Sequence, residues 1–177
     1  MRYRRLILPL LVLLALCCAC AGQETAQQAD YVLYFLTNEQ AAHGPALGTE
    51  PYSPLEGDKT AEGEELPDPG ALLEALTAGP VSEELVSPFP RGVSLRGWEW
   101  DGEQPGVVIV DLSEQYGALT DLSLTLADYC IVLTLSQVEG VEGVEITAGG
   151  HSVSYRGHQL LTAGEAVLFD GLAGEGA

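Results

Sequence analysis

The feature that most constrains this chain is a long apolar segment that runs into a short strand-like one. It reads TDLSLTLADYCIVLTLSQVEG followed by VEGVEIT, residues 120–147. At 100° per residue, its apolar side chains fall on two nearly opposite faces of the predicted helix. One face carries Leu122, Leu126, Tyr129, Cys130 and Leu133, and the other carries Leu124, Ile131, Leu135 and Val138.

A helix that covers one sheet needs only one apolar stripe, so the second face requires a second partner. Two explanations are open: burial against another part of the same chain, and docking of a separate protein. In the docking explanation, the interaction surface consists of Leu124, Ile131, Leu135 and Val138. In both explanations, a narrow exposed band is expected from the polar residues Thr125, Asp128 and Ser136.

The N-terminus has the pattern of a bacterial lipoprotein signal. The basic MRYRR precedes an apolar run at residues 6–16, which is too short to span a bilayer as a helix. The CCACAG that follows resembles a lipobox, in which a cysteine thiol is diacylated and becomes the mature N-terminus. Cys20 fits best because the small Ala19 precedes it, and Cys17 and Cys18 are the alternatives. An ordinary cleaved signal is the competing interpretation.

The lipobox predicts where the chain is located, and the cysteines left after cleavage predict that it has no internal disulfide. We expect a signal peptide at residues 1–19, a tether at 20–29, and a lipid anchor on the extracytoplasmic face of the cell membrane. Cleavage before Cys20 would leave one other cysteine, Cys130, so no internal disulfide can form. Cys130 lies on an apolar helix face, which favours a small buried hydrophobe over a nucleophile.

The charge of the chain is strongly negative. Its formal net charge is −19, and all 26 acidic residues follow the predicted signal. The basic residues that accompany them are Lys59, Arg91, Arg96 and Arg156. Such a field repels phosphate groups, so we expect neither nucleic-acid binding nor flat contact with an anionic lipid surface.

Three segments precede the hairpins. YVLYFL, at 31–36, is typical of a buried strand. Residues 37–68 lack periodicity and carry the acidic run EGDKTAEGEE, which predicts a disordered insertion, since the spacing does not match a calcium-binding EF-hand. Asp68 and Pro69 are suited to begin a helix through ALLEALTAGP, and Gly79-Pro80 to end it.

Two predicted hairpins complete the fold. Residues 92–100 and 107–112 alternate as a pair of strands, with a β-bulge at Gly97. Gly149-Gly150 joins residues 143–147 to a return strand. The order β-α-β-β-α-β-β predicts an α+β fold, a small mixed or antiparallel sheet with two helices packed on one face. The domain is expected at 30–158, followed by a C-terminal arm and frayed tail at 159–177.

Four strings in this order resemble the GerMN domain, the sporulation and spore germination domain of Gram-positive bacteria. They are YVLYFL (31–36), ALLEALTAGPVSEELVSPFPRGVSL (71–95), GVVIVDLSEQY (106–116) and YCIVLTLSQVEGVEGVEITAGG (129–150). The resemblance implies a ring-building-motif-like fold and a scaffolding role without catalysis, outside the cytoplasmic membrane of spore formers. The chain departs from the family in its acidic insertion and in Cys130, where the family tends to have Ser, and it lacks the second copy of the domain that some members carry.

Motifs for catalysis, cofactors or metals are lacking in the sequence, so we predict a protein that is not an enzyme and has no cofactor. His151 and His158 lack the spacing of a metal pair. Asp111 and Glu114 could form an acid/base pair, but a strand end and a cap explain them better.

Two functions from different classes are therefore open. The first is an envelope interaction protein that binds an envelope partner or self-associates. The alternative is a lipoprotein that binds a glycan or peptide at Trp98 and Trp100, which project from one side of a hairpin.

Overall fold

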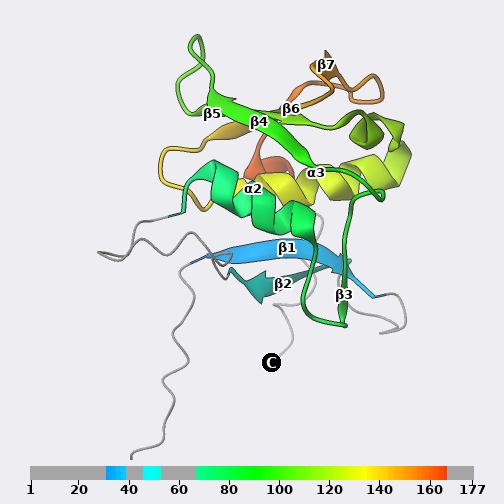
Figure 1. Ribbon diagram of the computed structural model, residues 1–177. Helices are drawn as coiled ribbons and strands as arrows, with labels where there is room; N and C mark the ends of the chain where they lie inside the picture. Colours follow the sequence, from blue (N-terminus) through cyan, green and yellow to red (C-terminus); the bar gives the residue numbers. More distant parts are fainter. Residues whose placement is uncertain (1–30, 39–45, 53–66, 167–177) are drawn as a thin grey trace, which may run out of the picture.

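The chain is arranged in three layers, with two helices between two sheets (Figure 1). The computed structural model describes residues 31–38, 46–52 and 67–166. The predicted signal peptide, the tether and residues 167–177 of the tail lie outside this part of the chain.

The larger sheet is mixed. Its strand order is β4-β5-β6-β7, and β8 also pairs with β6. The strands β5 and β6 are parallel because a helix connects them, and the other pairs are antiparallel. The strands are β4 (Leu95–Trp100), β5 (Val107–Leu112), β6 (Gly143–Ala148), β7 (His151–Ser152) and β8 (Leu160–Leu161).

Both predicted helices are present and cover one face of this sheet. They are α2 (Pro69–Ala78) and α3 (Asp121–Leu135). The Asp68 carboxylate accepts a hydrogen bond from the Ala71 amide at 2.8 Å, and Gly79 ends α2 with φ at 92°. Two short 3-10 helices are also present, η2 (Glu114–Ala118) directly before α3 and η3 (Ala163–Glu165) after β8. The predicted fold class, α+β with two helices on a mixed sheet, is confirmed.

A second, smaller sheet lies on the other side of the helices. It has the order β2-β1-β3, from β1 (Val32–Thr37), β2 (Leu47–Pro51) and β3 (Leu85–Val86). The strand β2 corrects the prediction that residues 37–68 are disordered throughout, because it pairs with β1 over five residues and buries Leu47. The rest of that insertion, 39–45 and 53–66, lies outside the described residues.

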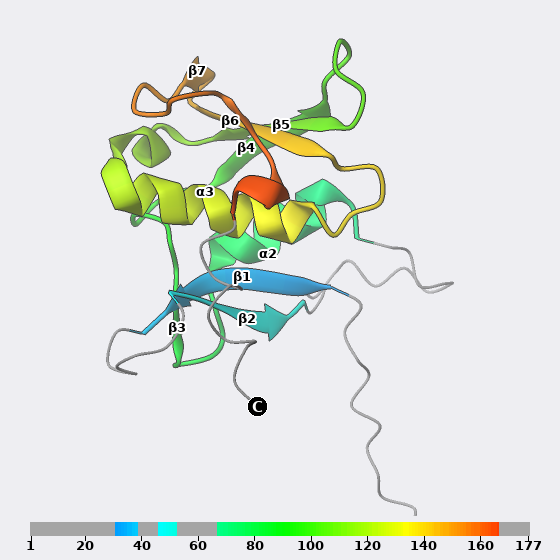
Figure 2. The ribbon, with the colours of Figure 1, turned by 180° about the vertical axis from the view of Figure 1, so that it is seen from behind.

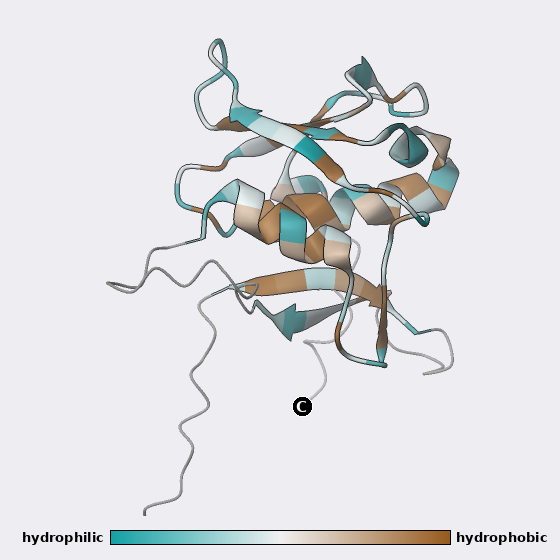
Figure 3. Ribbon diagram, in the orientation of Figure 1, coloured by the Kyte–Doolittle hydropathy of each residue, from teal (hydrophilic) through white to brown (hydrophobic). Residues whose placement is uncertain are grey.

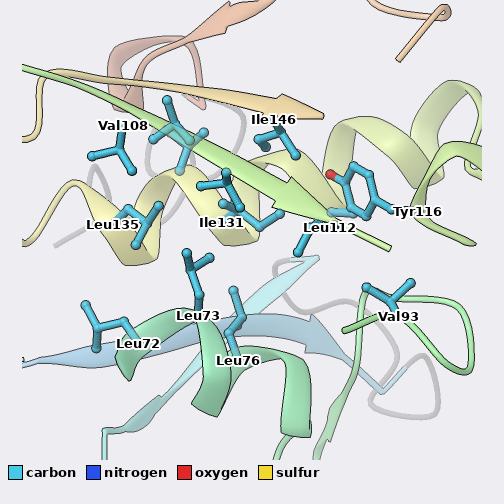
Figure 4. Close-up of a cluster of buried hydrophobic side chains, with 14 of the residues drawn as sticks. Leu72, Leu73, Leu76, Val93, Val108, Leu112, Tyr116, Ile131, Leu135 and Ile146 are labelled. Atoms are coloured by element: carbon cyan, nitrogen blue, oxygen red, sulfur yellow. The ribbon is translucent and has the colours of Figure 1, made fainter. Parts of the chain in front are cut away.

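The layers around α3 explain its two apolar faces, because the helix contacts β1 of the second sheet as well as α2 and β6. Leu124, Ile131 and Leu135 are 2% exposed or less and belong to the core, and Val138 packs against it. Figure 4 shows Ile131 and Leu135 between strand residues of the large sheet and the leucines of α2. The predicted interaction surface on this face is therefore wrong for the folded chain, because its own layers bury it. Figure 3 shows the apolar residues concentrated in the helices and β1, where the layers meet.

Side chains of α3 and of the residues just after it also close an edge of β1. The Val32 amide donates to Gln137 Oε1 at 2.9 Å, and Gln137 Nε2 donates to the Val32 carbonyl at 2.7 Å. The Tyr34 amide donates to Thr134 Oγ1 at 3.2 Å. Because β3 pairs only with Leu36 and Thr37, these side chains replace a strand along the remainder of the edge.

The predicted turns are confirmed. The register of β4 against β5 shifts between Leu95 and Gly97, where the β-bulge was expected. Gly149 and Gly150 have φ of 62° and 79°, the left-handed values that a two-residue hairpin turn requires. After β7, residues 153–166, called the C-terminal arm from here on, first pair with β6 as β8 and then pack on α3 as η3 (Figure 2).

Candidate functional site

A surface pocket of about 200 Å³ opens between α3 and the C-terminal arm. The α3 side contributes Leu124, Thr125, Asp128 and Tyr129. The arm contributes the segment 155–158 together with Leu161 and Glu165. Two segments that are far apart in sequence therefore form one site.

The floor of the pocket is a buried ion pair. The Arg156 guanidinium binds the Asp128 carboxylate with both ends of its fork, Nε to Oδ2 at 2.8 Å and Nη2 to Oδ1 at 2.5 Å. Its third nitrogen, Nη1, donates to the Ile146 carbonyl of β6 at 2.6 Å. The two side chains are only 3% and 5% exposed, so the pair fastens the arm to α3 and to β6 at the same time.

Tyr116 of η2 does not line the pocket but supports its floor from behind, through Asp128. Its hydroxyl donates to Asp128 Oδ1 at 2.5 Å, and the Arg156 guanidinium carbon lies 5.9 Å from the centre of its ring. Burial, assisted by the negative charge of Asp128, raises the pKa of Tyr116 well above its usual value. For Arg156, burial opposes the charge, but the hydrogen bonds and charge of Asp128 prevail and raise its pKa. The floor is therefore a charged pair backed by a neutral tyrosine.

The rim of the pocket is exposed and differs in chemistry. His158 Nε2 lies 3.1 Å from Glu165 Oε1, and the two side chains are 60% and 46% exposed. The other carboxylate oxygen of Glu165 accepts from the amide and hydroxyl of Thr162, in a capping box that begins η3. The backbone hydrogen bond from Thr162 is the largest cause that lowers the pKa of Glu165, so this carboxylate is ionised near neutral pH. Tyr155 also lines the pocket, and it is 68% exposed.

The predicted ligand surface at the tryptophans lies apart from this pocket. Trp98 and Trp100 contact each other edge to face, with ring centres 6.4 Å apart and planes at 78°. Trp98 is half-buried against the core and next to Gly70 of α2, whereas Trp100 is 45% exposed. The rings do not form one flat platform, and ligand binding there stays a prediction.

The structure gives the other polar candidates structural positions. Asp111 Oδ1 accepts from Thr147 Oγ1 at 2.8 Å and from the Gly150 amide at 2.7 Å, and its other oxygen lies 3.4 Å from Arg96. These bonds tie the Gly149-Gly150 turn to β5, as expected of a carboxylate near a strand end. Of the two histidines considered for a metal site, His158 lies on the pocket rim and His151 begins β7.

The predicted burial of Cys130 is confirmed. The residue is fully buried, and burial raises the pKa of its thiol to about 12. Within the described residues, no group of three His, Cys, Asp or Glu side chains is placed to hold a metal ion. No helix in that part of the chain is long and apolar enough to cross a membrane.

The buried ion pair in the floor of the pocket was not predicted from the sequence. Asp128 was expected in an exposed polar band of the helix, but it is 4% exposed. The available signal was the scarcity of cations: Arg156 is one of only four basic residues after the predicted signal, and it follows a hairpin at the end of the domain. That signal identifies an arginine that needs a partner without identifying the partner.

Comparison with known proteins decides the family. A family model named Germane, described as sporulation and spore germination, matches residues 32–154. The chain belongs to the Germane family. The α3 side of the pocket lies inside the range of the Germane match, whereas the residues that the arm contributes, from Tyr155 to Glu165, follow it.

Solved structures share the fold of this Germane domain. The first GerMN domain of the sporulation protein GerM from Bacillus subtilis matches with a TM-score of 0.54 and 18% identity, over 76% of this chain and 97% of that one. The tandem GerMN domains of the same protein match with a TM-score of 0.54 and 14% identity. That alignment covers 76% of this chain and 46% of the tandem structure, so the chain spans about half its length. No curated protein matches the chain significantly.

Proposed function

We propose that this chain is a lipid-anchored, non-catalytic interaction protein on the extracytoplasmic face of the cell membrane. Its Germane domain would bind an envelope protein during sporulation or germination. The family membership supports the process, and the lipobox at Cys20 supports the anchor. Residues 20–29 would serve as the tether, and the arm would belong to the domain because β8 pairs with β6.

The observation that carries a binding role is the chemistry of the pocket floor. Tyr116, Asp128 and Arg156 form a buried polar cluster in which each side chain is hydrogen-bonded within the protein. A general acid or base must reach the proton that it transfers on a substrate. The floor is nearly inaccessible, so it supports the shape of the site and offers little to a reaction.

The exposed residues around the pocket are of the kind that binds proteins. Tyr155 is 68% exposed, and Leu122 of α3, two helical turns before Tyr129, is 64% exposed. Leu122 and Tyr129 lie on the same side of α3, where Leu122 is exposed and Tyr129 is half-buried. Tyrosine is enriched at protein interfaces, and clustered exposed apolar residues mark such surfaces.

The proposal is tested in a Gram-positive host that expresses the full chain with a photo-crosslinking amino acid at Tyr155. We expect the chain in the membrane fraction, labelled by an alkyne fatty acid, and a higher-mass protein adduct after irradiation. The Cys20→Ala variant should lose the label, whereas Cys17→Ala and Cys18→Ala should keep it. The same cross-linker at Glu103, in the β4–β5 turn, is the position control. A soluble, unlabelled wild-type chain would contradict the anchor, and equal adducts at both positions would contradict a specific surface.

The exposure of Trp100 favours a second candidate function, binding of a glycan or peptide. Its test is retention of the full chain on insoluble peptidoglycan, compared with the Trp100→Ala variant. Retention that depends on Trp100 would support this alternative, and retention that does not would count against it.

A further inference from the structure

We infer that the pocket between α3 and the C-terminal arm receives a cationic side chain, a lysine or an arginine, of a protein partner. The inference rests on the proposed binding function and specifies the chemistry of the partner. It is carried by the charge of the pocket, the nature of its walls and the field of the whole chain.

The charge of the pocket is negative in total. In the floor, the positive charge of Arg156 is neutralised by Asp128 at hydrogen-bond distance, so this arginine is not available to an anionic ligand. The remaining carboxylate is Glu165, which its bonds to Thr162 keep ionised. Its Oε1 has one partner, the exposed His158, which is displaceable because both side chains are in contact with water.

The walls suit the rest of such a side chain. Leu124 and Leu161 provide apolar surface for the methylene groups of a lysine or arginine. Tyr129 and Tyr155 provide aromatic rings, whose faces attract cations. A surface pocket with apolar and aromatic walls and one available carboxylate on its rim matches a long side chain that ends in a positive charge.

The field of the chain favours the same partner. With a net charge of −19, the protein repels anionic partners and steers cationic ones toward it. The arm residues Tyr155, His158 and Glu165 follow the matched family range 32–154. These arm residues therefore give this chain a means of partner selection that lies outside the matched range.

The test uses ligand-observed NMR on the full chain, purified in detergent, with two probes of nearly equal size. Nα-acetyl-lysine amide carries the ammonium group, and Nα-acetyl-norleucine amide lacks it. We expect the lysine probe to bind at least fivefold more tightly. The Glu165→Gln variant keeps an acceptor for Thr162, so it should fold, and it should abolish the difference between the probes.

A matched control separates the pocket from the general acidity of the chain. Glu103→Gln makes the same charge change at an exposed position in the β4–β5 turn, and it should leave the preference for lysine intact. Equal binding of both probes to the wild type would overturn the inference, as would equal losses in the two glutamine variants. Either result would leave the cross-linking test at Tyr155 intact, so failure of the pocket is distinguishable from failure of the proposed function.

Discussion

The floor and the rim of the pocket each contain an ion pair, and the two pairs have opposite roles. In the floor, Asp128 and Arg156 are 5% and 3% exposed and make several hydrogen bonds within the protein. On the rim, His158 and Glu165 are 60% and 46% exposed, with one contact of 3.1 Å between them. Burial therefore decides whether a charged pair fixes the architecture or is available to a partner.

Solvation is the physical reason for this difference. Removing one member of a buried pair leaves an uncompensated charge in a medium that solvates it poorly, which costs about 3–5 kcal/mol. Water solvates the survivor of an exposed pair, so the pair itself adds little to stability.

Replacing Arg156 by Met should give the largest effect. The substitution leaves Asp128 buried without its cation and frees the Ile146 carbonyl, so the free energy of unfolding should fall by about 3–5 kcal/mol. Urea unfolding followed by circular dichroism measures this loss. Arg96→Met is the matched control, because Arg96 is half exposed and lies 3.4 Å from Asp111, and it should cost about 0–1 kcal/mol.

A second variant keeps this prediction testable if Arg156→Met fails to fold. Replacing both partners, Asp128→Leu with Arg156→Met, removes the orphaned charge and should restore much of the lost stability. Equal costs for Arg156→Met and Arg96→Met, or a double variant less stable than the single one, would contradict the assignment of the floor as a structural pair.

The next largest effect is expected for Tyr116→Phe. The change removes one hydrogen bond to a charged, buried acceptor, which should lower the free energy of unfolding by about 1.5–3 kcal/mol. Tyr155→Phe removes a hydroxyl from a ring that is 68% exposed, and it should be nearly neutral. Both are measured by urea unfolding, and a cost at Tyr155 as large as that at Tyr116 would remove the distinction between floor and rim.

The helices and turns could be predicted from the sequence because local signals determine them. Asp68 and Pro69 begin α2, Gly97 marks the bulge, and Gly149-Gly150 forms a turn that requires positive φ. The strand β2 could not be predicted, because LGTEP has no strand pattern of its own and is fixed by pairing with β1.

The floor of the site could not be predicted for a different reason. The partners Asp128 and Arg156 are 28 residues apart, and 26 acidic residues were available to four basic ones. Helical periodicity placed Asp128 in a polar band, and nothing local indicates that a segment after β7 covers that band. The two apolar faces of α3 did predict a second covering layer, but they could not identify β1, β2 and β3 as the strands that form it.

The buried tyrosine behind the floor should also weaken folding in alkali. Its folded-state pKa is raised, so the folded chain retains a proton that the unfolded chain releases near the ordinary pKa of 10.0. The contribution of Tyr116 is therefore complete below pH 10 and declines above it, by up to about 1.4 kcal/mol per pH unit. In Tyr116→Phe the free energy of unfolding should fall less steeply between pH 10 and 11, and slopes identical to the wild type would contradict the prediction.

The smallest effect on stability is expected from Glu165→Gln, which makes the sharpest comparison with Asp128→Asn. Both variants replace a carboxylate by an amide of the same shape, one on the rim and one in the floor. The urea midpoint of Glu165→Gln should not change measurably at pH 7, because its carboxylate is in water and the amide oxygen still accepts from Thr162. Asp128→Asn leaves the Arg156 charge buried without a counter-charge, so its midpoint should fall clearly. Similar midpoints for the two variants would mean that burial does not separate the structural pair from the available one.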